Sequence, residues 1–318
     1  MRTYLLRRLV QAVPTLFLLT VIAFGFVSLA PGDVVDAMYT PVDEYGLEAM
    51  AQRREALGLN EPVPVQYLRW LGHLVQGDLG RSFIRARPVA DMIGERIGAT
   101  LLLGLVSIVV AAVIGVTAGL ISGLKQYSLI DYIVTVLSYG AFSVPNFFLA
   151  LVLIYIFSVQ LKVLPSAGMF APGRDADLGN RITHMILPVI VLSVQFIGIY
   201  ARQTRSAVLE VLSADYVATA RAKGLRERIV TLRHIMPNAL IPVITIIGLS
   251  IPIVVTGTII TEVVFGWSGM GSLTVDAIYS RDYPVIMGIV LVIGAAVIVI
   301  NLIVDICYAV VDPRIRFS

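Results

Sequence analysis

The chain of 318 residues has few of the residue types on which catalytic and nucleotide-binding sites depend. It holds one cysteine and three histidines, and no two of the histidines form an HExxH pair. None of its lysines, Lys125, Lys162 and Lys223, follows a glycine, so the chain cannot carry the Gly-Lys of a P-loop. A single cysteine also excludes an internal disulfide. We therefore expect no catalytic, cofactor-binding or metal site, and the absences argue against an ATPase or a zinc intramembrane protease.

Charge is also scarce, because 14% of the residues are charged and 58% are hydrophobic, with a mean hydropathy of +0.88. Such values are typical of an integral membrane protein. About 20 residues of helix cross a bilayer core. Six stretches lack any Asp, Glu, Lys, Arg or His: 9–30, 97–124, 132–161, 185–201, 235–261 and 283–304. The fold class predicted is an all-α polytopic membrane protein with six transmembrane helices, of which the short fourth stretch borrows flanking residues.

The uncharged stretches also bear on how transport could be driven. Ion-coupled secondary carriers usually place acidic or basic relay groups within the membrane, and these stretches contain none. Glu262 and Asp305 mark the ends of spans. A secondary carrier of small solutes is therefore the alternative class, disfavoured by this absence.

Lys and Arg counts predict the orientation. With the N-terminus in the cytoplasm, the inner segments carry 13 of the 24 Lys and Arg residues and the two short outer loops carry four. Cytoplasmic loops are the richer in Lys and Arg, and loops beyond about 60 residues escape the rule. Both termini and residues 202–237 are thus expected in the cytoplasm. The chain divides into residues 1–30 with the first span, an outer segment at 31–96, a five-helix core at 97–309 and a tail at 310–318.

Residues 202–237 form a basic, helix-prone segment between two apolar stretches and hold seven of the 24 Lys and Arg residues. On a helix, Tyr216, Ala220 and Gly224 share one face, which a partner could approach closely. The basic residues around this face are Arg221, Lys223, Arg226 and Arg228. A plainer interpretation stays open, in which the arginines are membrane anchors, Gly224 ends a helix and Pro237 opens the fifth span.

Residues 215–224 read DYVATARAKG, and Pro237-Asn238-Ala239 follows thirteen residues after the glycine. This pattern resembles the "EAA" loop of ABC importer permeases, in the wording of the dipeptide/oligopeptide/nickel permease family. Further motifs match the B-type subunit of that family in order along nearly the whole chain: 4–9 (YLLRRL), 31–33 (PGD), 57–62 (LGLNEP), 77–82 (GDLGRS), 265–271 (FGWSGMG), 281–284 (RDYP) and 312–316 (DPRIR). Two departures stand out. The usual EAA glutamate and the alanine after it are Ala218 and Thr219 here, and Val34 replaces the proline that commonly follows Asp33.

The resemblance implies the ABC type I importer permease fold and a division of labour among subunits. A second, similar permease subunit would complete the pathway, two cytoplasmic ATPases would bind ATP and Mg²⁺, and an external binding protein would deliver the solute. It implies a bacterial or archaeal cytoplasmic membrane and no nucleic acid. The ATPase would grip a coupling helix formed by Asp215, Tyr216, Thr219, Ala220, Arg221, Lys223 and Gly224. Peptides, glutathione-like molecules, nickel chelates and oligosaccharides all remain open as substrates.

The fifth span carries a few small polar residues in an aliphatic run, namely Ser250, Thr256, Gly257 and Thr258. Hydroxyls and a bendable point suit a helix that lines a pathway. Ordinary packing of small residues between helices is the alternative. Because this span directly follows the basic segment, we expect it to line the pathway.

Overall fold

The computed structural model describes residues 2–39, 44–171 and 177–311, and for residues 2–5, 44, 254–257 and 307–311 it describes the backbone alone. Within these ranges the chain is helical, and the only strand-like pairing is an isolated bridge between Arg81 and Pro88. In the part of the chain that the structure describes, five helices are long and apolar enough to cross a membrane, and a bent helix pair supplies a sixth span if it is counted as one. The expected fold class is confirmed.

Contacts divide the chain into two compact units, and the first comprises residues 1–100 and 268–299. Its helices are α1 (Arg2–Leu29), α2 (Val34–Met38), α3 (Glu44–Ala56), α4 (Val63–Val75), α13 (Met270–Tyr279) and parts of α5 (Val89–Leu124) and α14 (Tyr283–Val311). Buried apolar side chains from α5, α13 and α14 form its core, including Val89, Leu273 and Ile289. Gly288 lets α14 approach α5, because a Cβ atom there would lie 2.5 Å from Cγ1 of Val89.

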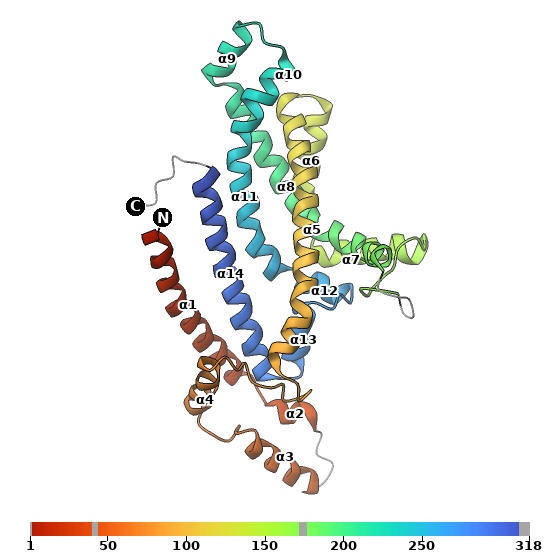
Figure 1. The fold of residues 1–318 in the computed structure, drawn as a ribbon. Coiled ribbons are helices and arrows are strands. Elements are labelled where there is room, and N and C mark those ends of the chain that lie inside the picture. The colour runs from red at the N-terminus through yellow and green to blue at the C-terminus, as the bar shows by residue number, and fades with distance from the viewer. Residues whose placement is uncertain (1, 40–43, 172–176, 312–318) are drawn as a thin grey trace. The chain divides into compact units, whose positions relative to one another are not determined.

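The second unit comprises residues 101–267 and 300–318. It contains the remainder of α5 and α14 together with α6 (Leu129–Ser143), α7 (Asn146–Leu153), the π-helical η1 (Ile154–Gln160), α8 (Leu178–Leu212), α11 (Met236–Gly257) and α12 (Ile259–Val264). Helix α8 is the centre of the unit, since it packs against α6, α7 and α11 (Figure 1). With 35 residues, α8 is twice as long as the uncharged stretch that predicted it.

Helices α5 and α8 approach closely along a line of glycines. A Cβ atom at Gly115 would lie 2.9 Å from the carbonyl oxygen of Ile197, and one at Gly119 would lie 2.3 Å from that of Ala201. At Gly123 it would lie 2.8 Å from Cβ of Val208. Small residues four apart on one face are the usual means by which membrane helices bring their backbones together.

The third predicted span, 132–161, is not one straight helix. Helices α6 and α7–η1 meet at 104°. Val144 at the break is extended, and Pro145 precedes the first residue of α7. Proline lacks an amide proton and disfavours the helical conformation of the residue before it, so the helix ends here.

Candidate functional site

The basic segment folds as three short helical elements at one end of α8 and α11 (Figure 1). These are α9 (Asp215–Ala222), α10 (Glu227–Val230) and the π-helical η2 (Thr231–Ile235), which runs directly into α11. Residues 202–212, the first part of the predicted segment, belong to the last three turns of α8. The segment is therefore an ordered structure that continues two long helices.

One face of α9 is buried. Val217 and Ala220 lie three residues apart and so share a side of the helix. They pack with Val208 of α8, Val230 of α10 and Ile235 of η2 in one apolar cluster. Because residues from four elements meet here, α9 is held on the ends of α8 and η2 by its own small core.

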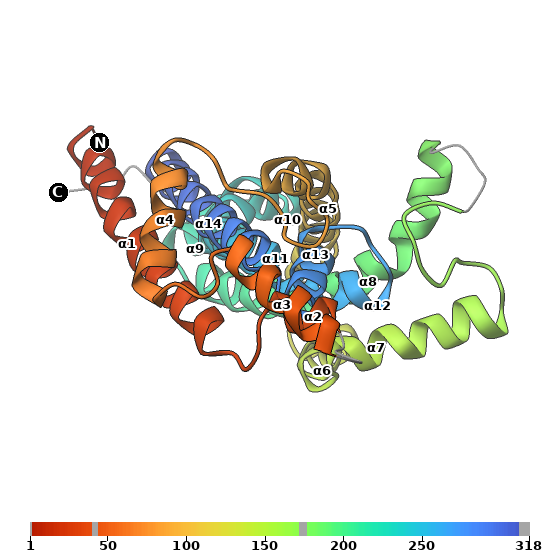
Figure 2. The same cartoon turned by 90° about the horizontal axis from the view of Figure 1, so that it is seen from below.

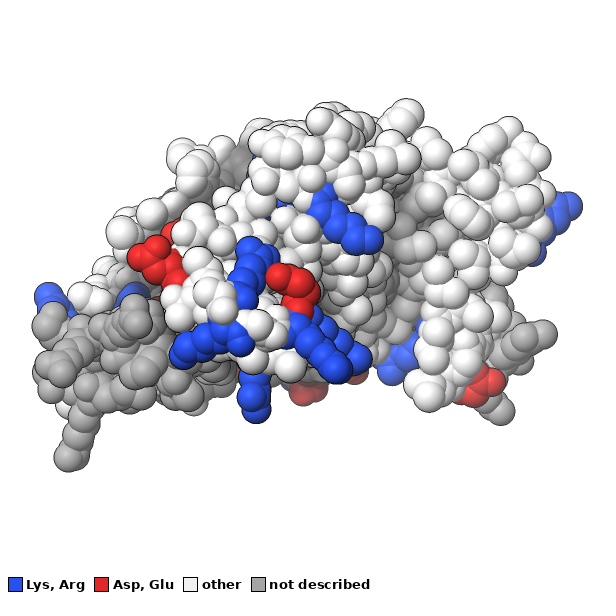
Figure 3. Space-filling model, turned by 90° about the horizontal axis from the view of Figure 1, so that it is seen from above, with Lys and Arg blue, Asp and Glu red and all other residues white. Residues whose placement is uncertain are grey.

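The opposite face of α9 is exposed. It presents Asp215, Tyr216, Ala218, Thr219, Arg221 and Lys223. Arg221 forms a two-contact ion pair with Glu227 of α10, at 2.9 Å for Nε and 3.3 Å for Nη2. Viewed onto this end of the molecule, several basic side chains and fewer acidic ones surround an uncharged surface (Figure 3). The surface thus combines small uncharged residues with a basic margin.

Gly224 ends α9. Its φ angle is +76°, in the left-handed region that favours glycine. The amide of Gly224 donates to the carbonyl of Arg221 at 2.9 Å, and that of Leu225 donates to the carbonyl of Ala220 at 3.4 Å. These two bonds make a Schellman motif, in which glycine satisfies the last carbonyls of the helix. No neighbouring atom lies within 4 Å of where a Cβ would stand.

The structure brings together six of the seven residues predicted for the coupling helix on one accessible surface. Asp215, Tyr216, Thr219, Arg221, Lys223 and Gly224 are all exposed. Ala220 differs, because it is 5% exposed and belongs to the internal cluster. The expectation that Tyr216, Ala220 and Gly224 form one open face is therefore corrected: α9 turns Ala220 inward, and the chain bends away at Gly224.

A buried ion pair beneath this segment was not predicted. Asp131, at the start of α6, is 3% exposed and accepts hydrogen bonds from Arg205 of α8 at 2.6 Å (Nε) and 3.0 Å (Nη2). Ser122 and the amide of Tyr127 complete its shell at 2.5 Å and 2.9 Å. A buried carboxylate needs such compensation. The pair fixes α6 and α5 to the turn of α8 that leads to α9.

The pathway candidates fall partly outside what the structure describes. Ser250 is buried, and its hydroxyl donates to the carbonyl of Ile246 at 2.8 Å within the same helix. Thr258 is fully buried. Thr256 and Gly257 are described by their backbone alone, which belongs to α11, so the side chain of Thr256 and the surroundings of Gly257 lie outside the description. Lining of the pathway by these four residues stays a prediction.

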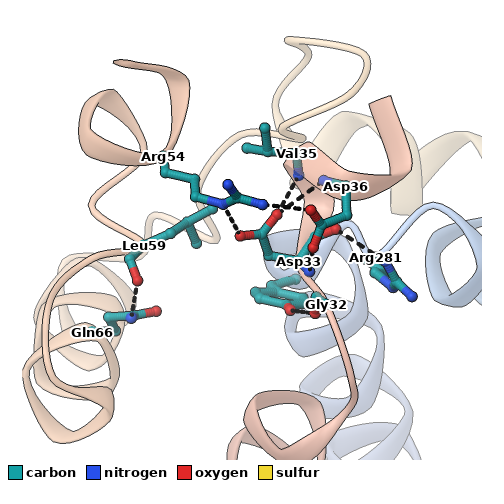
Figure 4. Close-up of polar contacts among 9 residues, drawn as sticks. Gly32, Asp33, Val35, Asp36, Arg54, Leu59, Gln66 and Arg281 are labelled. Atoms are coloured by element: carbon teal, nitrogen blue, oxygen red, sulfur yellow. Dashed lines mark hydrogen bonds and ion pairs between the residues drawn. The ribbon is translucent and has the colours of Figure 1, made fainter. Parts of the chain in front are cut away.

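The segment predicted to lie outside, residues 31–96, is held together by an ionic cluster (Figure 4). Asp33 caps α2 by accepting from the amides of Val35 and Asp36 at 2.9 Å and 3.0 Å. Arg54 of α3 donates to Asp33 at 2.6 Å and also contacts Asp36. Partial burial by itself would raise the pKa of Asp33, but the Arg54 and amide hydrogen bonds outweigh it, so the pKa lies below its usual value. Arg281 donates to the Asp33 carbonyl at 3.4 Å.

The outer segment is also tied to the start of α14. Asp282 is 3% exposed and accepts from the hydroxyl of Ser82 at 2.5 Å and from the amide of Phe83 at 3.0 Å. Two of the motifs singled out in the sequence, 77–82 and 281–284, thus meet in this contact. Among the described residues, no group of three or more His, Cys, Asp or Glu side chains is placed to hold a metal ion.

Comparison with known proteins places this arrangement in a family. Residues 115–317 match the model for the binding-protein-dependent transport system inner membrane component, and residues 1–104 match its N-terminal model. The chain is 42% identical over 318 residues to the oligopeptide transport system permease protein of Bacillus subtilis (strain 168), covering 100% of both chains. It is 37% identical over 339 residues to the dipeptide transport system permease protein of Escherichia coli (strain K12), covering 99% of both.

Solved structures agree on the fold. The inward-facing MetNI methionine ABC transporter matches with a TM-score of 0.55 at 17% identity, over 70% of this chain and 96% of that chain. An amino acid ABC transporter with histidines matches with a TM-score of 0.52 at 12% identity, over 69% and 94%. The family models and the full-length relatives lead to one conclusion. The chain belongs to the family of binding-protein-dependent transport system inner membrane components, the non-catalytic permease subunits of ABC importers.

Proposed function

We propose that this permease subunit forms half of a translocation pathway for peptides or solutes of similar size. A second, similar permease subunit supplies the other half, two ATPases bind ATP and Mg²⁺ in the cytoplasm, and a binding protein delivers the solute from outside. Full-length relatives named as oligopeptide, dipeptide and glutathione permeases support this substrate class. The family supports this division of labour, because its members are permease components of binding-protein-dependent systems.

The observation that carries the proposal is the construction of α9. Its inner face is anchored by Val217 and Ala220, while Tyr216, Ala218 and Thr219 are left open on the outer face. A rigid element with an accessible surface of one aromatic and two small residues can be bound by a partner, and its displacement would pass into α8 and, through η2, into α11. We therefore propose α9 as the coupling helix, with the ATPase subunit as its partner.

The charges around α9 suit a cytoplasmic position. Arg221, Lys223, Arg226 and Arg228 are all exposed there. Clusters of this kind are typical of the cytoplasmic side. We propose that both termini share this side and that the outer segment, residues 31–96, faces the binding protein. The pathway itself is proposed to pass along α11, at Ser250, Thr256, Gly257 and Thr258.

Uptake by the reconstituted complex tests the proposed function. Proteoliposomes that contain this chain with its permease partner, ATPases and binding protein should accumulate a radiolabelled tripeptide when ATP reaches the ATPases. Without ATP, an imposed proton or sodium gradient should drive no uptake. Accumulation that follows an ion gradient and ignores ATP would favour a secondary carrier and overturn the proposal. Preference of the delivery protein for a solute that is not a peptide, such as a nickel chelate or an oligosaccharide, would correct the substrate class alone.

A further inference from the structure

Helix α4 of the outer segment has three distinct faces, and the first packs on the membrane span α1. The ring of Tyr67 lies 6.5 Å from that of Phe17 and 5.3 Å from that of Phe24, measured between centroids. The Tyr67 hydroxyl lies 3.0 Å from the hydroxyl of Thr20, and Trp70 stacks on Tyr67 at 6.0 Å. Figure 1 shows α4 nearly end on and Figure 2 shows it from the side, against α1 in both.

The second face of α4 is polar and is bound to the turn that precedes the helix. The Gln66 side chain donates to the carbonyls of Leu59 and Glu61 at 3.1 Å and 2.8 Å. Arg69 forms an ion pair with the Glu61 carboxylate at 2.5 Å. The polar stripe therefore faces the remainder of the outer segment.

The third face is apolar and open. Val65, Leu68 and Val75 are spaced at three and seven residues, which places them on one side of a helix. Their exposed fractions are 43%, 63% and 82%. With 13 residues, α4 is about 20 Å long and too short to cross a bilayer. A short helix with one polar stripe and a broad apolar face suits the membrane interface.

The contacts with α1 fix the depth at which α4 lies relative to the end of this membrane span. The apolar part of α1 ends at Leu29, nine residues beyond Thr20 and five beyond Phe24. At about 1.5 Å per residue, the contacts of Tyr67 with Phe24 and Thr20 lie roughly 8–14 Å inside the outer end of the span, and its contact with Phe17 lies about 18 Å inside it. Interfacial helices sink about 5–10 Å into the boundary between headgroups and acyl chains. Next to this contact, α1 itself exposes Ile22 and Phe26 to the surroundings.

We propose that α4 is embedded in the outer leaflet of the bilayer, with Val65, Leu68 and Val75 among lipid acyl chains. The exposed apolar face of α4 continues the exposed apolar surface of α1, a membrane span, at a depth that a water-soluble binding protein does not reach. Tyr67 and Trp70 lie where aromatic side chains gather at membrane interfaces. The outer segment is then anchored to lipid along α4, beyond its role in meeting a binding protein.

Collision of nitroxide labels with two relaxing agents tests this proposal in the complete transporter, held in lipid nanodiscs. Single cysteines replace Leu68 or Val75 on the apolar face, and His73 on the polar side serves as the matched control, in a Cys307→Ala background. Oxygen concentrates in lipid, whereas chromium oxalate stays in water. We expect labels at 68 and 75 to collide more with oxygen, and the label at 73 to collide more with chromium oxalate.

Two outcomes would overturn the proposal. Labels at 68 and 75 that collide with neither agent would lie beneath a protein, either the second permease subunit or the binding protein. Labels that collide mainly with chromium oxalate would lie in water. Neither result would bear on ATP-driven uptake, so the proposed function is tested independently by the uptake experiment.

Discussion

The close approach of α5 and α8 at Gly119 predicts a large effect from adding one methyl group. In Gly119→Ala, the new Cβ would lie 2.3 Å from the Ala201 carbonyl oxygen and 2.7 Å from Cβ of Thr204. Ordinary contacts lie near 3.5 Å, so one helix must move by about 1 Å. Overpacking of this kind costs about 1–3 kcal/mol, against a gain of about 1 kcal/mol from replacing glycine by alanine in a helix. We expect a net loss of up to about 2 kcal/mol.

Gly98→Ala is the matched control on the same helix. Apart from the neighbouring backbone of its own helix, no heavy atom in the described part of the chain lies within 4 Å of its Cβ position, so only the gain in helix propensity remains. Thermal unfolding midpoints of the purified proteins in lipid nanodiscs should fall for Gly119→Ala and stay level or rise for Gly98→Ala. Equal midpoints for Gly119→Ala and Gly98→Ala would refute the inferred packing of α5 on α8.

The Asp131–Arg205 ion pair, the end of α11 and the Asp33–Arg54 contact each predict the effect of a substitution. Asp131→Asn should destabilise the protein by roughly 1.5–3 kcal/mol, because the charge-assisted hydrogen bond to Arg205 is lost. Combining it with Arg205→Gln should cost less than the sum of the two single losses in stability. Additive losses in thermal unfolding would contradict the pairing. Gly257→Leu should slow ATP-driven uptake while the ATPases still co-purify, and uptake at the parental rate would assign this part of α11 to packing. Because the folded pKa of Asp33 is depressed, its stabilisation is complete above the unfolded pKa of about 3.9 and is lost as pH falls through the lower folded value. Arg54→Gln should therefore lessen the loss of stability on going from pH 7 to pH 3, and an unchanged loss would speak against this pairing.

Hydropathy predicted most of the membrane helices because each needs an uncharged run long enough to cross the bilayer. It placed the second span at 97–124, whereas α5 begins at Val89. The first turns of α5 carry charges, among them Asp91, so the uncharged run understates the helix. The run at 132–161 does not reveal that the third span is a bent pair of helices. Pro145 stands at the break, but membrane helices often tolerate proline, so its presence alone does not predict a bend.

In the basic segment, sequence patterns do not predict which residues are buried. Periodicity grouped Tyr216 with Ala220, but which side of a short helix is buried depends on partners far along the chain. Ala220 is buried because Val208 and Ile235 pack with it in one cluster. These residues come together only because the chain turns back through α10. Asp131 and Arg205 are 74 residues apart and pair only because α6 packs on α8. No local motif marks such contacts.

If the ATPase binds the outer face of α9, a substitution at Ala218 tests this contact more cleanly than one at Gly224. A bulky residue at Gly224 would also strain a backbone with φ of +76°, whereas Ala218 is exposed in regular helix. The decisive measurement is the amount of ATPase that co-purifies with the tagged chain from membranes. We predict that Ala218→Trp loses the ATPase while it still inserts normally, and that Ala51→Trp, the same change on exposed α3, retains it. Parental amounts of ATPase bound to Ala218→Trp, with normal ATP-driven uptake, would show that the ATPase does not bind the outer face of α9.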